Sequence, residues 1–256
     1  MGEQLERYLV FHLFGPLQSW GPVAVGEHRG DEGRPTKSAV LGLLGAALGL
    51  SREEADVHEG LHRTLGFAVR VDAPGIVVKD YHTSQVPGSR KGKRWHTRRE
   101  ELGEQKLNTV LSDRYYRADA CFTVVLWMRE AGGISLAQLS QALARPRFHL
   151  YLGRKSCPPA WPLIPKIVEA PNLKAAFAAA PLPQLLREQV RGPRGGGRGQ
   201  RVYWEGNDDS LTTQHLFHRR DGLASRRRWL FHAREERGGL LEPEGDAAPD
   251  HREGRD

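Results

Sequence analysis

A run of cations interrupted by aromatic side chains is the stretch of this sequence best suited to bind a nucleic acid. In SRKGKRWHTRRE, six cations precede the first acid, Glu100, and Trp95 and His96 stand in the middle of the run. Cations neutralise phosphates and release counterions, while an aromatic ring gives a base a surface on which to stack. We therefore expect this run to bind single-stranded nucleic acid, with a solvated surface loop as the alternative. The six cations are Arg90, Lys91, Lys93, Arg94, Arg98 and Arg99.

Three shorter basic stretches, DRYYRA, GRKS and SRRRWLFH, could extend such a surface. Their alternatives are core packing for the tyrosines, a subunit contact for GRKS, and protection of a sheet edge for the three consecutive arginines. A fourth stretch, RGPRGGGRGQR, could cradle phosphates through its backbone or serve as a flexible linker, and it lacks the Walker and dinucleotide-binding patterns. The candidate side chains in the first three are Arg114, Tyr115, Arg154, Lys155, Arg226 and Arg227.

Catalysis requires a different set of residues. Metal-independent RNA cleavage needs a general base, a general acid and a cation near the phosphate, and Lys79, Tyr81 and His82, with His96 nearby, could supply them. Such residues are common in charged loops, so the signal is weak. His12 lies inside an apolar strand and is expected to be a core histidine. No GxSxG, paired-acid or histidine metal motif is present, and we expect neither metal nor cofactor.

Amino-acid composition indicates the type of ligand and the cellular compartment. The formal net charge is +7, from 38 Lys+Arg against 31 Asp+Glu, and 30 of the 38 cations are arginine, which suits phosphate contacts and base stacking. The two cysteines form neither a disulfide framework nor a CxxC metal motif, as is typical of a reducing cytoplasm. No signal-peptide pattern and no apolar run of about 18 residues is present, so we expect a cytoplasmic protein without a membrane span.

Apolar patterns predict the elements that position these groups. Residues 8–14 form a buried strand that ends at Gly15-Pro16. A long loop then leads to Thr36, a candidate N-cap of a helix that Gly49 can end. Ser51 and Glu54 form a capping box for a second helix, which reaches to about residue 63.

The next elements follow the same alternation of strands and helices. Residues 65–72 place Phe67, Val69 and Val71 on one face of a half-buried strand, and residues 119–128 form another strand. More than forty residues with little apolar periodicity separate these two strands. Ser135 then caps a helix, and residues 148–153 return as a strand.

The order strand, helix, strand, strand, helix, strand predicts the α+β class, with a ferredoxin-like, RRM-like βαββαβ core. We expect one domain over residues 1–234, with an insertion at about 77–114 and a strand-rich C-terminal extension from about 153. Within the extension, residues 201–206 and 227–233 are predicted strands. Residues 235–256 are acidic and poor in apolar side chains, so we expect a disordered tail.

The N-terminal segments carry a resemblance to a known family. YLVFHLFGPLQSWG, followed by RPTKSAVLGLLGAALGL and SREE, resembles the N-terminal signature of the CasD subunits of Cascade in type I-E CRISPR-Cas systems. These subunits belong to the repeat-associated mysterious protein (RAMP) superfamily, whose members have ferredoxin-like cores. NTVLSDRYYRADACFTVVLW and YLGRKSCPPAWPL resemble later motifs of the same family, in the same order.

The resemblance implies a non-catalytic, RNA-binding role in antiviral defence. Such a subunit holds the 5′ handle of the guide RNA (crRNA) and caps one end of a ribonucleoprotein complex. Its partners would be the Cascade backbone subunit, the Cascade large subunit and, through the assembled complex, target DNA. The insertion would be a thumb that crosses the guide RNA. In the related I-C subtype the homologous subunit is an endoribonuclease that makes guide RNAs, and this is the alternative function.

The resemblance also suggests a purpose for the long loop before the first helix. An RNA handle has unstacked bases, so a groove that holds it needs an aromatic platform, amides for base edges and cations for phosphates. Two of the candidates would lie in the first helical turn, whose free N–H groups favour an anion. Packing under the loop is the alternative for the tryptophan. The predicted set is Gln18, Trp20, Arg34, Lys37 and Ser38.

Overall fold

The fold combines two β-sheets with six helices over the part of the chain that the structure describes. The structure is a computed structural model and describes residues 5–21, 24, 26–89, 92–189, 200–228 and 230–241. The predicted α+β class is confirmed. Within the described residues, no helix is long and apolar enough to cross a membrane.

The larger sheet has seven antiparallel strands in the order β10-β11-β9-β4-β7-β1-β8. Its centre is apolar, because β1 and β7 are buried over most of their length. The strands are β1 (Glu6–Phe14), β4 (Leu65–Ala73), β7 (Cys121–Met128), β8 (Lys166–Ala170), β9 (Gln200–Trp204), β10 (His215–Ser225) and β11 (Leu230–Leu241).

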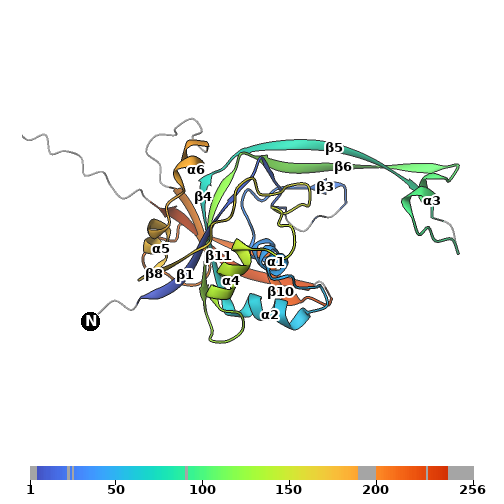
Figure 1. The fold of residues 1–256 in the computed structure, drawn as a ribbon. Coiled ribbons are helices and arrows are strands. Elements are labelled where there is room, and N and C mark those ends of the chain that lie inside the picture. The colour runs from blue at the N-terminus through green and yellow to red at the C-terminus, as the bar shows by residue number, and fades with distance from the viewer. Residues whose placement is uncertain are drawn as a thin grey trace, which may run out of the picture.

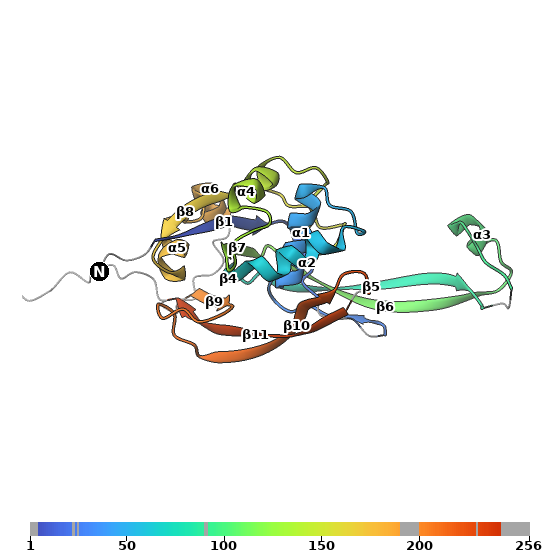
Figure 2. The same ribbon diagram turned by 90° about the horizontal axis from the view of Figure 1, so that it is seen from below.

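Helices cover both faces of this sheet (Figures 1 and 2). Leu9, Phe11 and Leu13 of β1 pack in one cluster with α1, α2 and α4, whereas Tyr8 and Val10 pack with α5 on the other face. This division follows from the alternation of side chains along a strand. The helices are α1 (Lys37–Leu48), α2 (Ala55–Thr64), α4 (Leu136–Ala144), α5 (Leu173–Ala179) and α6 (Gln184–Gln189).

Local capping signals predicted two helices well. Thr36 accepts a hydrogen bond from the Ala39 N–H at the start of α1, and Gly49 ends the helix in a left-handed conformation. Ser135 and Gln138 form the expected capping box of α4. The predicted start of α2 is wrong, because the segment from Ser51 forms a turn and the helix begins at Ala55.

The strand predicted over residues 148–153 is also wrong. This segment has no strand partner and instead crosses the C-terminal end of α1, where the Phe148 N–H donates to Ala46 O at 3.1 Å. The strand that pairs with β1 in place of the predicted one is β8, further along the chain. Orphan carbonyls at a helix end accept hydrogen bonds from any nearby N–H, and an apolar hexapeptide pattern cannot distinguish that use from a sheet ladder.

A long hairpin projects from the body of the protein (Figure 1). It consists of β5 (Ile76–Pro87), the short helix α3 (Arg98–Leu102) near its far end, and β6 (Leu107–Ala118). Its register pairs Ile76 with Ala118 and Pro87 with Leu107. Two short strands, β2 (Leu17–Gln18) and β3 (His28–Arg29), pair with β6 near its base. The region predicted as an irregular insertion is therefore mainly a β-ribbon.

The C-terminal extension has strands near both predicted places, β9 and β11, but β11 begins at Leu230, since Arg227 lies in a turn, and it is much longer than expected. β11 continues to Leu241, so the tail predicted from residue 235 is wrong for residues 235–241. Glu236 is fully buried there, and Gly238 and Gly239 pair with β9. Residues 242–256, and residues 190–199 of the glycine-rich stretch, lie outside the described part of the chain.

His12 belongs to a buried polar cluster in the sheet and makes folding sensitive to acid. Its Nδ1 lies 3.0 Å from Thr123 Oγ1, which donates to Asp72 Oδ2, and Asp72 pairs with Arg70. Burial, and secondarily the Arg70 charge, lower the pKa of His12 from 6.5 to about 4.

We expect His12 to contribute stability that is present above about pH 6.5 and is lost as the pH falls toward 4, because the unfolded imidazole takes up a proton first. Between about pH 7.5 and pH 5 the loss from this group is about 2 kcal/mol. Urea unfolding at the two pH values measures it. His12→Gln should show a smaller loss than the wild-type protein, and equal losses would contradict the assignment.

Candidate nucleic-acid interface

Two residues of the predicted handle-binding loop, Gln18 and Trp20, are buried in the core of the protein. Gln18 is fully buried, and its Nε2 donates to Ala120 O. Trp20 donates from Nε1 to Gln18 Oε1 at 2.8 Å and meets Phe122 edge to face. Their burial contradicts the prediction that they face RNA. The alternative, that the tryptophan packs under the loop, is the correct one.

Arg34 and Lys37 are buried in ion pairs. Arg34 pairs with Glu236 and stacks 3.6 Å above the ring of Tyr203, while Lys37 Nζ lies 2.8 Å from Glu205 Oε2. Their side chains therefore contact protein carboxylates, and the prediction that they contact RNA is contradicted too. Sequence patterns gave no sign of this, since the partners lie about 170 to 200 residues away.

These pairs are part of a larger buried ion network between the start of α1 and strands β9 to β11. Arg234 pairs with Asp221, Glu236 and Glu205. Asp221 also accepts a hydrogen bond from the Lys37 N–H at the N-terminus of α1, a position where a carboxylate is favoured. The full network contains Glu32, Arg34, Lys37, Glu205, Arg219, Asp221, Arg234 and Glu236. Ser38, by contrast, is half-exposed.

The cationic run lies at the far end of the hairpin. Lys93 pairs with Glu104 and lies 5.7 Å from the Trp95 ring centroid, and Trp95 donates to the same carboxylate. Arg94, Arg98 and Arg99 are exposed. Arg90 and Lys91 lie outside the described residues. The hairpin thus presents cations and an indole ring far from the core.

Along the ribbon, side chains alternate between two faces. Lys79, Tyr81 and Tyr115 share one face, whereas His82 lies on the other and bonds to Asp80. The three proposed nuclease groups Lys79, Tyr81 and His82 therefore do not converge on one point. His96 is further away, beside the start of α3. The structure contradicts the catalytic grouping suggested by their nearness in the sequence.

Cations also gather beside the base of the hairpin. Arg154 lies 4.8 Å from the ring centroid of Tyr116, and Arg114 shares the ribbon face of that tyrosine. Lys155 is exposed in the turn that follows Arg154, and Tyr115 is half-buried. We call Arg114, Arg154 and Lys155 the hairpin-base cations. The structure brings them together from β6 and from the segment after α4.

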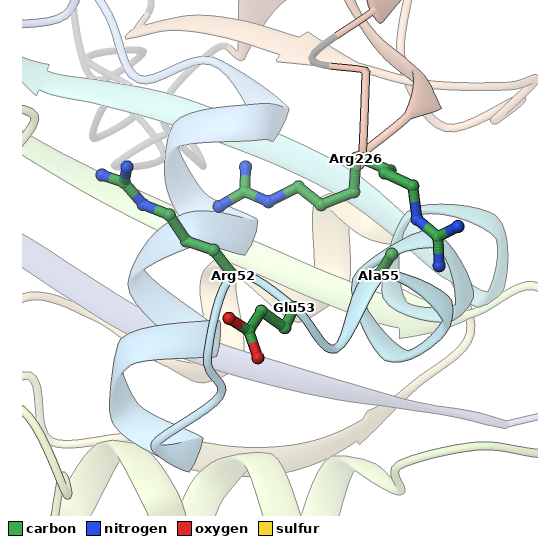
Figure 3. Close-up of a pocket in the computed structure, with 5 residues that line it drawn as sticks. Arg52, Glu53, Ala55 and Arg226 are labelled. Carbon is green, nitrogen blue, oxygen red and sulfur yellow. The ribbon is translucent and has the colours of Figure 1, made fainter.

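A second basic site lies at the turn between β10 and β11 (Figure 3). Arg226 and Arg227 line a pocket of about 500 Å³ together with Arg52, Glu53 and Ala55. The Arg226 N–H donates to Glu59 Oε1 at 3.0 Å. Burial and the nearby Arg52 charge lower the pKa of Arg226. Sequence reasoning missed Arg52, because it stands inside a segment that looks like a helix cap.

Among the described residues, no group of three or more His, Cys, Asp or Glu side chains is arranged to hold a metal ion. The chemistry that the surface offers is contact with phosphates through guanidinium and ammonium groups, and stacking on exposed rings.

Comparison with known proteins connects this geometry to one family. A family model described as CRISPR-associated protein (Cas_Cas5) matches residues 8–235. The CRISPR system Cascade subunit CasD of Escherichia coli (strain K12) is 34% identical over 216 residues, which cover 83% of this chain and 86% of that protein.

Two solved structures are similar in fold over nearly the whole length. A chain of a structure named CRISPR RNA-guided surveillance complex has a TM-score of 0.62 and 27% identity, with 92% of this chain and 90% of that chain covered. A structure named crystal structure of Cas protein has a TM-score of 0.56 and 30% identity, with 92% and 95% covered.

Proposed function

Because this chain belongs to the Cas5 family of CRISPR-associated proteins, we propose that it is a CasD-type subunit of a Cascade surveillance complex. In that role it binds the 5′ handle of the guide RNA and caps the complex in the cytoplasm. The observation that carries the proposal is the hairpin, which holds cations and Trp95 away from the core. A protein that only had to fold would gain nothing from such a ribbon.

The proposed RNA-binding surface runs from the far end of the hairpin to its base. It contains the described cations Lys93, Arg94, Arg98 and Arg99, and the hairpin-base cations Arg114, Arg154 and Lys155. Tyr115 supplies a half-exposed ring on the opposite face of the ribbon from Arg114. Phosphate contacts from these groups would hold the guide, while stacking would engage its unpaired bases.

The strand order β4-β7-β1-β8 supports a ferredoxin-like core. In a βαββαβ unit the first strand lies between the third and the fourth, and β1 lies between β7 and β8. We propose that the hairpin is the thumb of this core. Exposed apolar side chains on it, Ile76 at 70% and Tyr81 at 60%, suit contact with the Cascade backbone subunit as well as with RNA. The large subunit, and target DNA through the complex, are the other proposed partners.

We propose that binding occurs without catalysis. Processing of precursor guide RNA remains the alternative, but the separation of Lys79 and Tyr81 from His82 across the ribbon gives it no support. The test is incubation of the protein with end-labelled repeat RNA and with mature guide RNA in chelator, analysed on denaturing and native gels. Binding of guide RNA without cleavage is expected. Specific cleavage at the base of the repeat hairpin would instead establish the nuclease.

Salt dependence tests the cations at the hairpin end directly. Replacing Lys93, Arg94, Arg98 and Arg99 by alanine should flatten the slope of log affinity against log salt by about 3, since each phosphate contact contributes about 0.7 to 0.9. A fluorescence titration of guide RNA over a range of salt concentrations measures the slope. The matched control replaces four exposed arginines elsewhere, Arg7, Arg63, Arg129 and Arg145. An equal slope change in both variants would mean that only net charge matters.

A further inference from the structure

A groove lies beside the basic pocket of Figure 3 and opens between α1, α2, the segment 148–153 and the β10–β11 hairpin. Its volume is about 540 Å³, within the range of small-ligand sites. Its 18 described lining residues include two arginines and three histidines but no carboxylate. Arg52 and Arg226 line both the groove and the pocket, so the two form one continuous depression.

The floor of the groove is made of small residues on α1. Gly42, Gly45 and Ala46 line it, and a Cβ added at Gly42 would meet no atom within 4 Å. A flat ring could therefore approach the helix closely at this position. The two glycines lower the helix propensity of α1, and their packing against the sheet does not explain Gly42, because that residue is exposed.

Aromatic side chains form one wall. Phe148 is 54% exposed and Tyr151 is 44% exposed, although both occupy a segment that is held firmly at each end. The Phe148 N–H donates to Ala46 O, and the Leu152 N–H donates to Cys157 O at 2.7 Å. Exposed rings on a fixed backbone are ready for stacking, because little conformational entropy remains to be lost on binding. Leu223 and Phe231 line the groove from the β10–β11 hairpin.

The positive charge of the groove comes from its guanidinium groups. Burial, with help from nearby cations, lowers the pKa of His62 to about 3, so this imidazole is neutral at physiological pH. Among the acids near the rim, Glu59 accepts a hydrogen bond from the Arg226 N–H through Oε1, and the Glu53 carboxylate points away from the Arg52 guanidinium group in Figure 3. An anion at Arg52 and Arg226 would relieve the repulsion between them.

We propose that this groove binds one unpaired nucleotide of single-stranded RNA. Its base stacks on Phe148 or Tyr151 above Gly42, and its phosphate contacts Arg52 and Arg226. The proposal rests on the proposed guide-RNA function and adds a second contact on the body of the protein, away from the hairpin. A protein segment would fit the aromatic wall, but Arg52, Arg226 and Arg227 outnumber Glu53, the one carboxylate among the described lining residues of the depression, and this excess of cations favours a phosphate-bearing ligand.

The test uses two groove variants of the full chain, Gly42→Leu and Arg52→Gln. The side chain introduced by Gly42→Leu would fill the groove without changing charge, and because leucine is a better helix former than glycine, folding should be preserved. Gly60→Leu is the matched control: a Cβ there also meets no atom, but Gly60 does not line the groove. The probes are guide RNA and an unstructured RNA oligonucleotide of about 16 nucleotides, each carrying 5-iodouracil for photocrosslinking.

We expect both groove variants to bind each RNA about tenfold more weakly than wild type, as the loss of one stacked base or one phosphate contact implies. Crosslinks to Phe148 or Tyr151, mapped by mass spectrometry, should disappear in Gly42→Leu and persist in Gly60→Leu. Wild-type RNA binding by both groove variants, with no crosslink in the groove, would overturn the proposal that the groove binds a nucleotide and leave the guide-RNA function intact. Unchanged RNA binding with failed assembly of the complex would overturn it in favour of a protein partner. Absence of RNA binding by wild type would overturn both proposals.

Discussion

Lys37→Ala should lower the free energy of unfolding by about 3 to 5 kcal/mol, the usual cost of removing one partner of a buried ion pair. The Lys37 side chain is 3% exposed and Glu205 is 8% exposed. Burial lowers the pKa of the ammonium group, and Glu205 opposes that effect by pairing with it. Without Lys37, the Glu205 carboxylate stays buried, and among the described residues its remaining ion pair is the longer one to Arg234, at 3.4 Å. Urea unfolding at neutral pH measures the loss.

Two controls define the cause of this effect. Lys79→Ala removes a pair of similar length, 2.9 Å to Asp113, whose lysine is 52% exposed, so its effect on stability should be far smaller than that of Lys37→Ala. The double variant Lys37→Met, Glu205→Gln should recover part of the loss, because no uncompensated carboxylate remains. Wild-type stability of Lys37→Ala combined with weaker RNA binding would return Lys37 to the RNA-contacting set.

Shortening the hairpin should weaken guide-RNA binding by on the order of 100-fold at physiological salt, since the cations of its far end leave with it. Residues 83–111 can be replaced by an Asn-Gly turn that joins His82 to Ser112, which are already paired in the ribbon. The core contains none of the described residues in this span. The free energy of unfolding should therefore change by less than about 1 kcal/mol. Native gels and urea unfolding on the same preparation measure both quantities.

The full-length variant with alanine at Lys93, Arg94, Arg98 and Arg99 distinguishes the contribution of these cations to RNA binding from that of the rest of the hairpin. If it binds guide RNA as weakly as the shortened protein, the cations account for the contribution of the hairpin. If it binds more tightly, the ribbon and its Trp95 ring add contacts of their own. If the shortened protein binds guide RNA as tightly as wild type, the hairpin is not part of the RNA interface.

Sequence patterns predicted the elements whose signals are local. Thr36 and Gly49 mark α1 because a cap acts within one helical turn. The alternation of Phe67, Val69 and Val71 marks β4, but the prediction of a half-buried strand is wrong, because both faces of β4 are buried. The cationic run was also recognisable as an exposed surface. These features depend on neighbours a few residues away, which a single sequence displays.

The missed features depend on partners far along the chain. Arg34 and Lys37 looked suited to phosphate until Glu236 and Glu205 were placed beside them. Residues 235–241 of β11 looked like part of a polar tail because they include charged residues such as Glu236, yet that carboxylate is buried and pairs with Arg34 and Arg234. Burial of charge requires a tertiary partner, and no local pattern identifies one.

The buried ion network constrains the order in which this protein can be completed during synthesis. α1 is made early, but Lys37 finds Glu205, and Arg34 finds Glu236, only after most of the chain has left the ribosome. Until then both cations can remain hydrated at the rim of the nascent sheet, where charge opposes premature association. Insertion of β11 then places Glu236 between Arg34 and Arg234. The last strand therefore completes the surroundings of the first helix.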